Sequence, residues 1–206
     1  MRLLLSVLLG YLYGSIPLGY IIGRLKGIDV TKHGFKKLGT SNVFKVLGIW
    51  YAIPTAIFDL TKGVIPFIIS TKIFSIPLEY AWLSAVCAVC GHNWPLWIRF
   101  KGEGRGIATT IGILLYLFPL TTLKTILIFL IITALTRSTA PATPVFLILT
   151  PIAIWLEKQP PWALYLSVSL LVVTFTKRIM GNMEYVKMSP SKLKGLLYVI
   201  IWDRSE

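Results

Sequence analysis

Long apolar runs without a charged side chain dominate this chain. Five of them are 18 to 21 residues long, close to the length of about 20 residues with which an α-helix crosses a membrane. They cover residues 3–23, 80–98, 106–123, 138–156 and 159–176. Only 14% of the 206 residues are charged, against about 25% in a typical soluble domain, so a soluble fold is excluded.

A sixth apolar stretch, residues 46–70, is interrupted only by Asp59 and Lys62. A helix places residues three apart on neighbouring faces, so these two side chains are expected to neutralise each other within a span. The alternative is that they line a polar cavity. Neither interpretation makes them catalytic.

The run at residues 125–136 is the shortest candidate span, with 12 residues between Lys124 and Arg137. The long side chains at its two ends are able to reach opposite membrane interfaces. With this run included, we predict an all-α integral membrane protein with seven transmembrane helices. No linker or repeat separates two halves, so residues 1–206 are predicted to form a single polytopic membrane domain.

Basic residues are distributed unevenly between the predicted loops. Of the 21 Lys and Arg residues, 16 lie in residues 24–45, 99–105 and 177–206 or in the turn at Arg137. Seven spans place all of these on one side, and the positive-inside rule assigns that side to the cytoplasm. The N-terminus is then outside and the C-terminus cytoplasmic. The net charge of +13 is attributed to membrane lipids as partners, not to nucleic acid.

The segment 179–206 differs from the rest of the chain. Its apolar run, residues 195–202, is too short to span a membrane, and it follows Lys187, Lys192 and Lys194. This pattern predicts a cytoplasmic tail that lies at the membrane interface.

The first predicted cytoplasmic loop combines glycine, lysine and short hydroxyl or amide side chains. Glycine permits close backbone approach, lysine supplies charge, and the short side chains supply hydrogen bonds, which together suit a phosphate group. The alternative is an ordinary basic loop followed by a helix cap. The candidate binding residues are Gly34, Lys36, Lys37, Gly39, Thr40, Ser41 and Asn42.

The second basic loop has three glycines alternating with charged residues directly before a span. A helix N-terminus offers unpaired N–H groups to an anion, so this segment also suits phosphate. The alternative is a glycine hinge with solvated charges. The candidates are Lys101, Gly102, Gly104, Arg105 and Gly106.

His92 stands near the cytoplasmic end of the span 80–98. An ionisable group at membrane depth is a functional candidate, although a lone histidine is often a structural hydrogen-bonding residue. Cys87 and Cys90 are interpreted as small packing residues, and neither a metal nor a cofactor is expected.

Several short motifs in the first half of the chain resemble those of the bacterial acyl-phosphate:glycerol-3-phosphate acyltransferases of the PlsY family. They are, in order, Gly14-Ser15-Ile16-Pro17, the stretch from Gly34 to Asn42, Asp59-Leu60-Thr61-Lys62-Gly63, Gly91-His92 with Pro95, and Phe100-Lys101-Gly102 to Arg105-Gly106-Ile107-Ala108-Thr109. The resemblance implies a seven-span enzyme of the bacterial inner membrane whose active-site loops face the cytoplasm. It also implies transfer of a fatty acyl group from acyl phosphate to glycerol 3-phosphate, which forms lysophosphatidic acid for phospholipid synthesis.

The resemblance also implies roles for particular residues. Lys45, Arg105 and His92 become the catalytic candidates, with Lys45 and Arg105 neutralising phosphate charge. Asn182 is a shifted counterpart of an asparagine in the third motif of the family and joins the substrate-binding candidates of the two loops.

The sequence departs from the family pattern at several positions: Lys36 and Lys37 replace a Gly-Asn pair, Lys45 replaces an arginine, and Arg105 is nearest to the lysine of the second loop. Two further departures concern hydrogen-bonding groups. Phe35 replaces a serine of the first loop, and residues 176–182 lack the histidine of the third motif. These departures leave open a catalytically impaired paralogue that binds phosphate-bearing lipid precursors. A transporter of small anions is a further alternative, motivated by Asp59 and Lys62, but no inverted repeat is visible.

Overall fold

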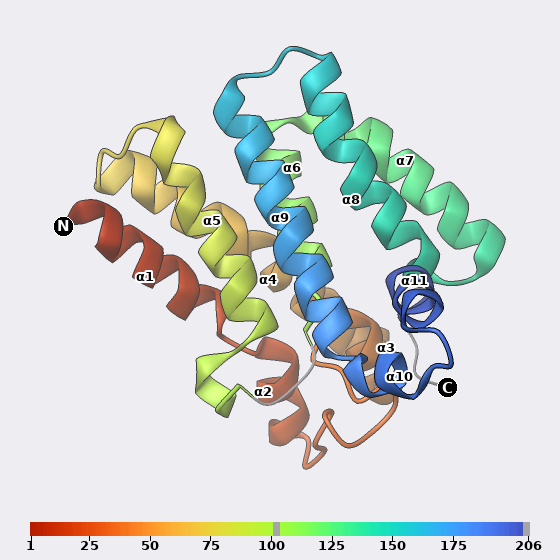
Figure 1. Ribbon diagram of the computed structural model, residues 1–206. Helices are drawn as coiled ribbons and strands as arrows, with labels where there is room; N and C mark the ends of the chain where they lie inside the picture. The colour runs from red at the N-terminus through yellow and green to blue at the C-terminus, as the bar shows by residue number, and fades with distance from the viewer. Residues whose placement is uncertain (101–103, 204–206) are drawn as a thin grey trace. The chain divides into compact units, whose positions relative to one another are not determined.

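The computed structural model describes residues 1–100 and 104–203. Regular elements in these residues are all helical, without a strand, which confirms the predicted all-α class. The chain divides into two compact units, Met1–Tyr116 and Leu117–Glu206. Each unit has its own helices (Figure 1). Each also has its own buried apolar side chains.

The first unit begins with a long apolar helical segment and ends within a short helix. A π-helical turn, Ile69–Ile73, extends its fourth helix, and a 3₁₀ turn, Leu96–Ile98, follows its fifth. The boundary between the two units falls inside the sixth helix, because its last residue, Leu117, is the first residue of the second unit. Its α-helices are α1 (Arg2–Gly14), α2 (Leu18–Leu25), α3 (Thr40–Leu47), α4 (Ile49–Ile68), α5 (Leu78–Asn93) and α6 (Ile107–Leu117).

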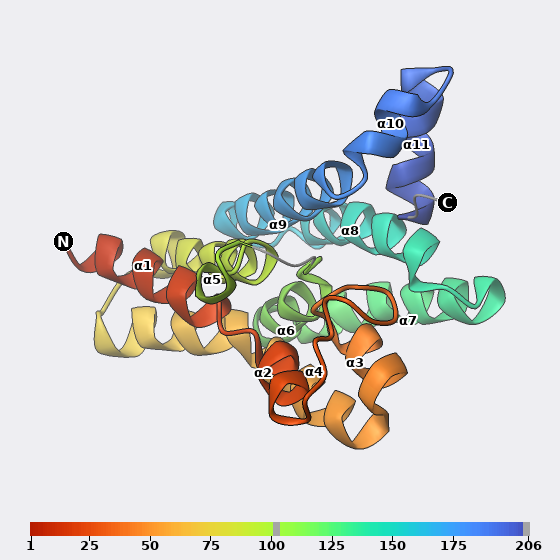
Figure 2. The ribbon, with the colours of Figure 1, turned by 90° about the horizontal axis from the view of Figure 1, so that it is seen from below.

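Small residues allow α1 and α5 to pack closely, side by side in both views (Figures 1 and 2). A Cβ atom at Gly10 would collide with the carbonyl oxygen of Ser84, and one at Gly14 with that of Ala88. In a membrane, lipid tails solvate apolar side chains as well as a neighbouring helix does, so such close backbone contacts carry much of the helix association. This packing holds the end of α5, where His92 lies.

The predicted first span is helical but interrupted. α1 ends at Gly14 and α2 starts at Leu18, because Pro17 has no N–H to donate and disfavours helical geometry at the residue before it. Together the two helices form an apolar segment of 24 residues, Arg2–Leu25, which is long enough to cross a membrane.

The span predicted at residues 80–98 is shorter in the structure. α5 has 16 residues and ends at Asn93, so it is about 24 Å long at 1.5 Å per residue. The backbone leaves the helix at Trp94, directly before Pro95, since a residue preceding proline avoids the α region.

The second unit consists of three long helices followed by two short ones. α7 packs against α8, α8 against α9, and α10 against α11, as Figure 2 shows for the last pair. The rings of Phe129 and Phe146 meet edge to face at 6.0 Å between centroids in the α7–α8 contact. The helices are α7 (Pro119–Thr136), α8 (Thr139–Leu156), α9 (Pro161–Met180), α10 (Met183–Met188) and α11 (Lys192–Trp202).

The predicted boundary between spans at Lys124 is wrong. The helix breaks at Phe118, and α7 starts with Pro119, because proline suits the first turn of a helix and restricts the residue before it. Lys124 instead lies within α7, where its Nζ donates a hydrogen bond of 2.8 Å to Glu157 Oε1. The short run 125–136 thereby becomes part of an 18-residue helix.

Within the described residues, five helical segments are long and apolar enough to cross a membrane. α5 and α6, with 16 and 11 residues, are shorter than that length. The five segments are Arg2–Leu25, Ile49–Ile73, Pro119–Thr136, Thr139–Leu156 and Pro161–Met180.

Arg178 attaches the C-terminal helix α11 to the rest of the second unit. Its Nε donates to the carbonyl oxygen of Val199 at 3.0 Å, and its Nη2 donates to those of Ile201 and Ala140, both at 2.9 Å. The acceptors Val199 and Ile201 belong to the last turn of α11, where carbonyl groups lack a donor from a following turn. The Val199 carbonyl also accepts a hydrogen bond of 3.0 Å from the Asp203 N–H. Only 2% of Arg178 is exposed, so one buried side chain caps α11 and joins it to α8.

Candidate functional site

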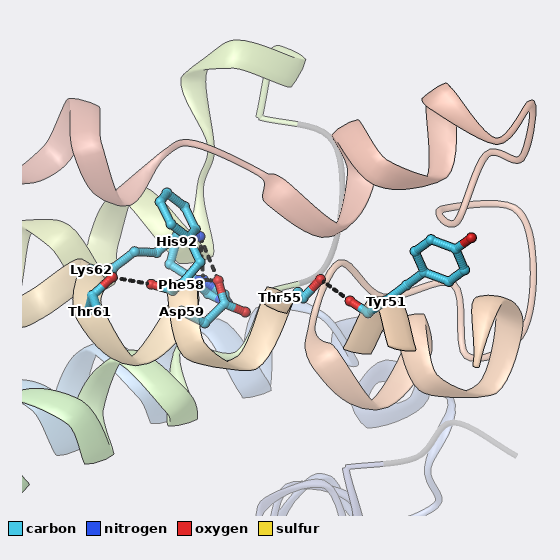
Figure 3. A network of polar contacts seen from close by, with 7 residues as sticks. All are labelled: Tyr51, Thr55, Phe58, Asp59, Thr61, Lys62 and His92. Atoms are coloured by element: carbon cyan, nitrogen blue, oxygen red, sulfur yellow. Dashed lines mark hydrogen bonds and ion pairs between the residues drawn. The ribbon is translucent and has the colours of Figure 1, made fainter. Parts of the chain in front are cut away.

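Three ionisable side chains meet inside the first unit. Lys62 Nζ lies 2.8 Å from Asp59 Oδ1 and 3.2 Å from His92 Nδ1, and His92 Nδ1 lies 3.5 Å from Asp59 Oδ1 (Figure 3). Asp59 and Lys62 are one turn apart on α4, whereas His92 comes from the end of α5. The predicted pairing of Asp59 with Lys62 is thus confirmed, and His92 is a third member that the sequence did not connect to them.

This triad, Asp59, Lys62 and His92, is almost completely buried, with exposed fractions of 3%, 2% and 7%. Buried charges require a partner, because the desolvation of an isolated ion costs several kcal/mol. The Phe58 ring also lies near the ammonium, with its centroid 5.3 Å from Lys62 Nζ. The group is therefore a compensated polar cluster within an apolar helix bundle.

The turn before α6 packs directly on His92. A Cβ atom at Gly104 would lie 2.8 Å from His92 Cδ2 and 2.9 Å from His92 Nε2, so only glycine lets the backbone approach this edge of the ring. Gly106 has φ +69°, a left-handed conformation that favours glycine. Arg105 is half-buried between them. Two of the predicted second-loop glycines thus place this turn against a histidine of α5.

A small pocket opens beside the triad. All three members line it, and so do the break between α1 and α2, represented by Ser15 and Pro17, and Leu38 and Pro95. Segments that are up to about eighty residues apart in the sequence therefore contribute to one pocket. The alternative that Asp59 and Lys62 line a polar cavity is compatible with their pairing, since they do both.

Asn93 is a buried residue outside the predicted set of site residues. Its side chain has no exposed surface, and neither Oδ1 nor Nδ2 has a hydrogen-bond partner among the residues that the structure describes. A Cβ atom at Gly106 would lie 2.9 Å from Asn93 Oδ1, which places this amide at the start of α6. Its sequence signal is a polar residue directly after His92 at the end of an apolar run.

Asn42 organises the first basic loop from within. Its Oδ1 accepts a hydrogen bond of 2.6 Å from the Phe35 N–H, and its Nδ2 donates to the carbonyl oxygens of Val30 and Lys37 at 2.8 and 2.7 Å. The side chain is completely buried. These contacts hold the loop closed from residue 30 to residue 37, so the Asn42 amide shapes the loop.

Asp29 stabilises the start of the same loop. Its Oδ1 accepts hydrogen bonds from Thr31 Oγ1 at 2.6 Å and from the Thr31 N–H at 3.0 Å. The hydrogen bond from the Thr31 hydroxyl is the largest influence that lowers the pKa of Asp29 below its usual range.

The remaining candidates of the first loop lie around its surface. Lys36, Ser41 and Lys45 are exposed, and Lys45 Nζ lies 4.1 Å from the centre of the Phe35 ring. Thr40 Oγ1 is buried and has no hydrogen-bond partner in the described part of the chain. Other candidates here are the exposed Gly34 with φ +63°, the half-buried Lys37, and Gly39 at the N-cap of α3.

Among the predicted site residues that the structure describes, His92 alone lines this pocket. Lys101 and Gly102 lie outside the described residues. Asn182 belongs to the second unit, where its Nδ2 donates to the Arg178 carbonyl oxygen at 2.9 Å and to Asp203 Oδ1 at 3.0 Å. This contact lies beside the attachment of α11.

The sequence matches one protein family over most of its length. The family model is described as glycerol-3-phosphate acyltransferase and matches residues 4–185. A glycerol-3-phosphate acyltransferase of Rubrobacter xylanophilus is 37% identical over 175 residues, which cover 84% of this chain and 87% of that protein. Glycerol-3-phosphate acyltransferase 1 of Dehalococcoides mccartyi is 30% identical over 208 residues, 98% of this chain and 99% of that protein.

Solved structures agree with the sequence comparison. The crystal structure of PlsY, an integral membrane glycerol 3-phosphate acyltransferase, in its glycerol 3-phosphate form has a TM-score of 0.80 and 28% identity, covering 91% of this chain and 92% of that chain. Its lysophosphatidic acid form has a TM-score of 0.78 and 26% identity, covering 96% and 100%. The chain is therefore an integral membrane protein that belongs to the glycerol-3-phosphate acyltransferase family.

Proposed function

We propose that this membrane acyltransferase moves a fatty acyl group from acyl phosphate to the 1-hydroxyl of glycerol 3-phosphate. Membership of the family supports the acceptor and the reaction class. The structural observation that carries the proposal is the convergence of the family-like motifs in the first unit. The break at Pro17, the first loop through Leu38, and the triad line one pocket, and the Gly104–Gly106 turn packs on its histidine.

The chemistry requires mainly positioning and charge neutralisation. The oxygen of the 1-hydroxyl attacks the acyl carbonyl carbon, the bond from that carbon to the phosphate oxygen breaks, and the hydroxyl proton leaves with the released phosphate. The products are lysophosphatidic acid and inorganic phosphate. Acyl phosphate is a mixed anhydride with a good leaving group, so aligned substrates and fixed positive groups account for much of the rate. No covalent enzyme intermediate and no cofactor is required.

The proposed roles follow the charge and position of each side chain. Lys45 and Arg105 neutralise phosphate charge, and His92 donates a hydrogen bond at the pocket. Asn93 adds a buried amide beside the Gly106 turn. The proposed substrate-binding residues of the loops and the second unit are Gly34, Lys36, Lys37, Gly39, Thr40, Ser41, Asn42, Lys101, Gly102, Gly104, Gly106 and Asn182.

Product formation by the purified protein tests the proposal. We expect mass spectrometry to detect lysophosphatidic acid when acyl phosphate and glycerol 3-phosphate are both supplied, and none when either is omitted. Acyl coenzyme A and acyl carrier protein thioesters serve as alternative donors in matched reactions. A product that requires one of these thioesters would overturn the proposed donor, and no product from any donor would overturn the reaction.

The exchange of the first-loop serine for Phe35 supports a second candidate, a paralogue that binds phosphate-bearing lipid precursors without turnover. Phe35 supplies no hydroxyl, and its ring lies under Lys45, one of the proposed phosphate-binding cations. Binding of glycerol 3-phosphate without product would favour this candidate. A Phe35→Ser variant distinguishes this candidate further, because the variant would gain turnover if the missing hydroxyl is the cause of the inactivity.

For the membrane topology, we propose seven spans, with α5 and α6 as the two short ones, in the bacterial inner membrane. The N-terminus is then outside, and the C-terminus and both basic loops are cytoplasmic. The support is the charge distribution, with 16 of 21 basic residues assigned to the cytoplasmic side. Cysteines introduced at Lys36 and Lys187 should react with an impermeant reagent only from the cytoplasm, and one at Ile76 only from outside. Labelling of the cysteines at positions 36 and 187 from opposite sides of the membrane would exclude this topology.

We further propose that residues 1–206 act as one polytopic domain and that residues 179–206 lie at the cytoplasmic membrane interface. In α11, Leu193, Leu197 and Ile201 recur every four residues and are all exposed, with Lys192 and Lys194 beside them. An apolar helix face with adjacent lysines favours an anionic lipid surface. Depth-dependent quenching of a probe at Leu197 in vesicles with anionic lipid tests this, and a fully water-exposed probe would contradict it.

A further inference from the structure

The hydrogen bonds of the triad determine which nitrogen of His92 carries a proton. A lysine ammonium has three N–H donors and no acceptor, so the 3.2 Å contact from Lys62 Nζ to His92 Nδ1 uses Nδ1 as an acceptor. A nitrogen that accepts a hydrogen bond carries no proton of its own. The proton of the neutral ring is then on Nε2.

The position of Asp59 agrees with this assignment. Asp59 Oδ1 lies 2.8 Å from Lys62 Nζ but 3.5 Å from His92 Nδ1, so the lysine is the closer hydrogen-bond partner of the carboxylate. The negative charge of the buried Asp59 carboxylate neutralises the positive charge of the buried Lys62 ammonium. A protonated His92 would add a second cation within 3.2 Å of Lys62 Nζ, in a site where uncompensated charge is costly.

The opposite edge of the ring faces the second basic loop. A Cβ atom at Gly104 would lie 2.9 Å from His92 Nε2, so the backbone of this turn runs directly along the Nε2 edge. The ring also lines the pocket beside the triad. The proton on Nε2 therefore lies at the edge of the ring that faces this turn.

We propose that Asp59 and Lys62 are positioning residues that hold His92 as the neutral Nε2–H tautomer, a fixed hydrogen-bond donor to a phosphate oxygen bound at the Gly104–Gly106 turn. The identity of that phosphate as part of a substrate rests on the proposed acyl transfer. A donor oriented before the substrate arrives loses no free energy to reorientation during binding. Substitutions at Asp59 or Lys62 are then expected to act through His92.

Nitrogen NMR tests the tautomer without any turnover. The chain has two histidines, so a His33→Gln variant labelled with ¹⁵N-histidine reports on His92 alone. We expect a protonated Nε2 and an unprotonated Nδ1, which have widely separated ¹⁵N resonances. Two similar resonances, as in an imidazolium ring, or a protonated Nδ1 would overturn the proposal.

A Lys62→Met variant tests the cause of the tautomer. Without the ammonium, Asp59 becomes the remaining partner for Nδ1, and we expect the proton to move to Nδ1 so that it donates to the carboxylate. The Asp59→Leu, Lys62→Met double variant removes both charges and both hydrogen-bonding groups and keeps the site neutral if the single variant fails to fold. A protonated Nε2 that persists unchanged in the folded variants would show that the pair does not set the tautomer.

Inorganic phosphate tests the donor role independently of acyl transfer. We expect phosphate to shift the Nε2 resonance of His92, whereas chloride at equal ionic strength leaves it in place. A correct tautomer with no response to phosphate or glycerol 3-phosphate would overturn the donor role. A response to phosphate in a protein that forms no lysophosphatidic acid would support the donor role and contradict the proposed function, so the two failures are distinguishable.

Two substitutions of His92 provide the kinetic test in an active protein. A glutamine amide reaches the position of Nε2, whereas an asparagine amide reaches only that of Nδ1. We expect His92→Gln to retain roughly tenfold to hundredfold more kcat/KM than His92→Asn, the range for a hydrogen bond to a charged group. Equal losses in two variants with native-like melting temperatures would contradict a role of the Nε2–H.

Discussion

Lys45 lies over the aromatic ring of Phe35, with its Nζ 4.1 Å from the ring centroid. Both side chains are exposed, and a cation–π contact at an exposed site contributes about 0.5–1 kcal/mol. Phe35, which stands where the family pattern has a serine, thus holds the Lys45 ammonium at the first loop.

The two residues of this contact are predicted to differ in their effect on turnover. Phe35→Leu removes the ring but keeps an apolar side chain, so kcat/KM should fall by less than about fivefold, in line with the weak contact. Lys45→Met removes a phosphate-binding charge and should lower kcat/KM by about tenfold or more. Steady-state assays that vary glycerol 3-phosphate measure both, and a larger loss for Phe35→Leu would reverse the assigned roles.

Arg105 is predicted to contribute to phosphate binding from its place between two glycines before α6. Arg105→Ala should reduce kcat/KM about tenfold or more, because a charge-assisted hydrogen bond is lost beside the positive end of a helix. Arg99→Ala is the matched control, since Arg99 is an exposed arginine just before the same loop, whereas Arg105 is half-buried. Similar kinetics for the two variants would identify Arg105 as an ordinary surface charge.

The contact between α1 and α5 is predicted to tolerate no larger residue at Gly10. Gly10→Val places a branched side chain against the Ser84 carbonyl and should lower stability by about 1–3 kcal/mol or more, the usual cost of overpacking. Leu8→Ala alters an exposed position of the same helix and serves as the control. Thermal unfolding in detergent measures both, and an unchanged melting temperature for Gly10→Val would contradict the close packing.

Arg178 is predicted to be needed for the attachment of α11. Arg178→Met leaves the carbonyl groups of Val199, Ile201 and Ala140 without this donor. Each acceptor that then stays buried and unpaired lowers the stability by about 1–3 kcal/mol. Hydrogen–deuterium exchange should accelerate in Lys192–Trp202, whereas a Lys187→Met control at an exposed position of α10 should leave it unchanged. Equal protection in both variants would contradict the capping role of Arg178.

The stability of the second unit is predicted to depend weakly on pH through Glu157. Hydrogen bonds from Lys124 and then from Thr121 lower the pKa of Glu157 below its usual value. A carboxylate with a lowered pKa adds stability above its unfolded-state pKa, and that contribution disappears as the pH falls through the folded-state pKa.

Glu157→Gln should therefore lower the melting temperature at neutral pH and have a diminishing effect below about pH 4, near the reference pKa of glutamate. The difference should correspond to no more than about 1 kcal/mol, because Lys124 is largely exposed. A constant difference between native protein and variant across this pH range would rule out the charge as its cause.

Features set by local sequence were the most predictable. The apolar runs gave the positions of the long helices, because burying a helix backbone in lipid requires about 20 apolar residues in succession. The pairing of Asp59 with Lys62 was equally local, since i and i+3 side chains meet on any helix. The helix break at Phe118 also has a local signal in Pro119, which determines the start of α7 more strongly than the charge of Lys124 does.

Features that depend on contacts between distant segments were not predictable in the same way. His92 joins Asp59 and Lys62 only because α4 packs against α5, and no spacing in the sequence encodes that contact. The three hydrogen bonds of the Asn42 amide to the backbone of its own loop likewise have no signal in the residue spacing. A sequence shows which polar groups are present but not which hydrogen-bond partners they find after folding.

The sequence by itself determined that this protein is helical, apolar enough for a membrane, and equipped with two basic glycine-containing loops. These properties follow from composition and periodicity, which act along the chain. Tertiary structure alone decided that Gly104 lies against the Nε2 edge of His92 and that Lys62 contacts its Nδ1 edge. The physical reason is that hydrogen-bond geometry requires atoms to be placed within a few tenths of an ångström, and only the packing of several helices provides that accuracy.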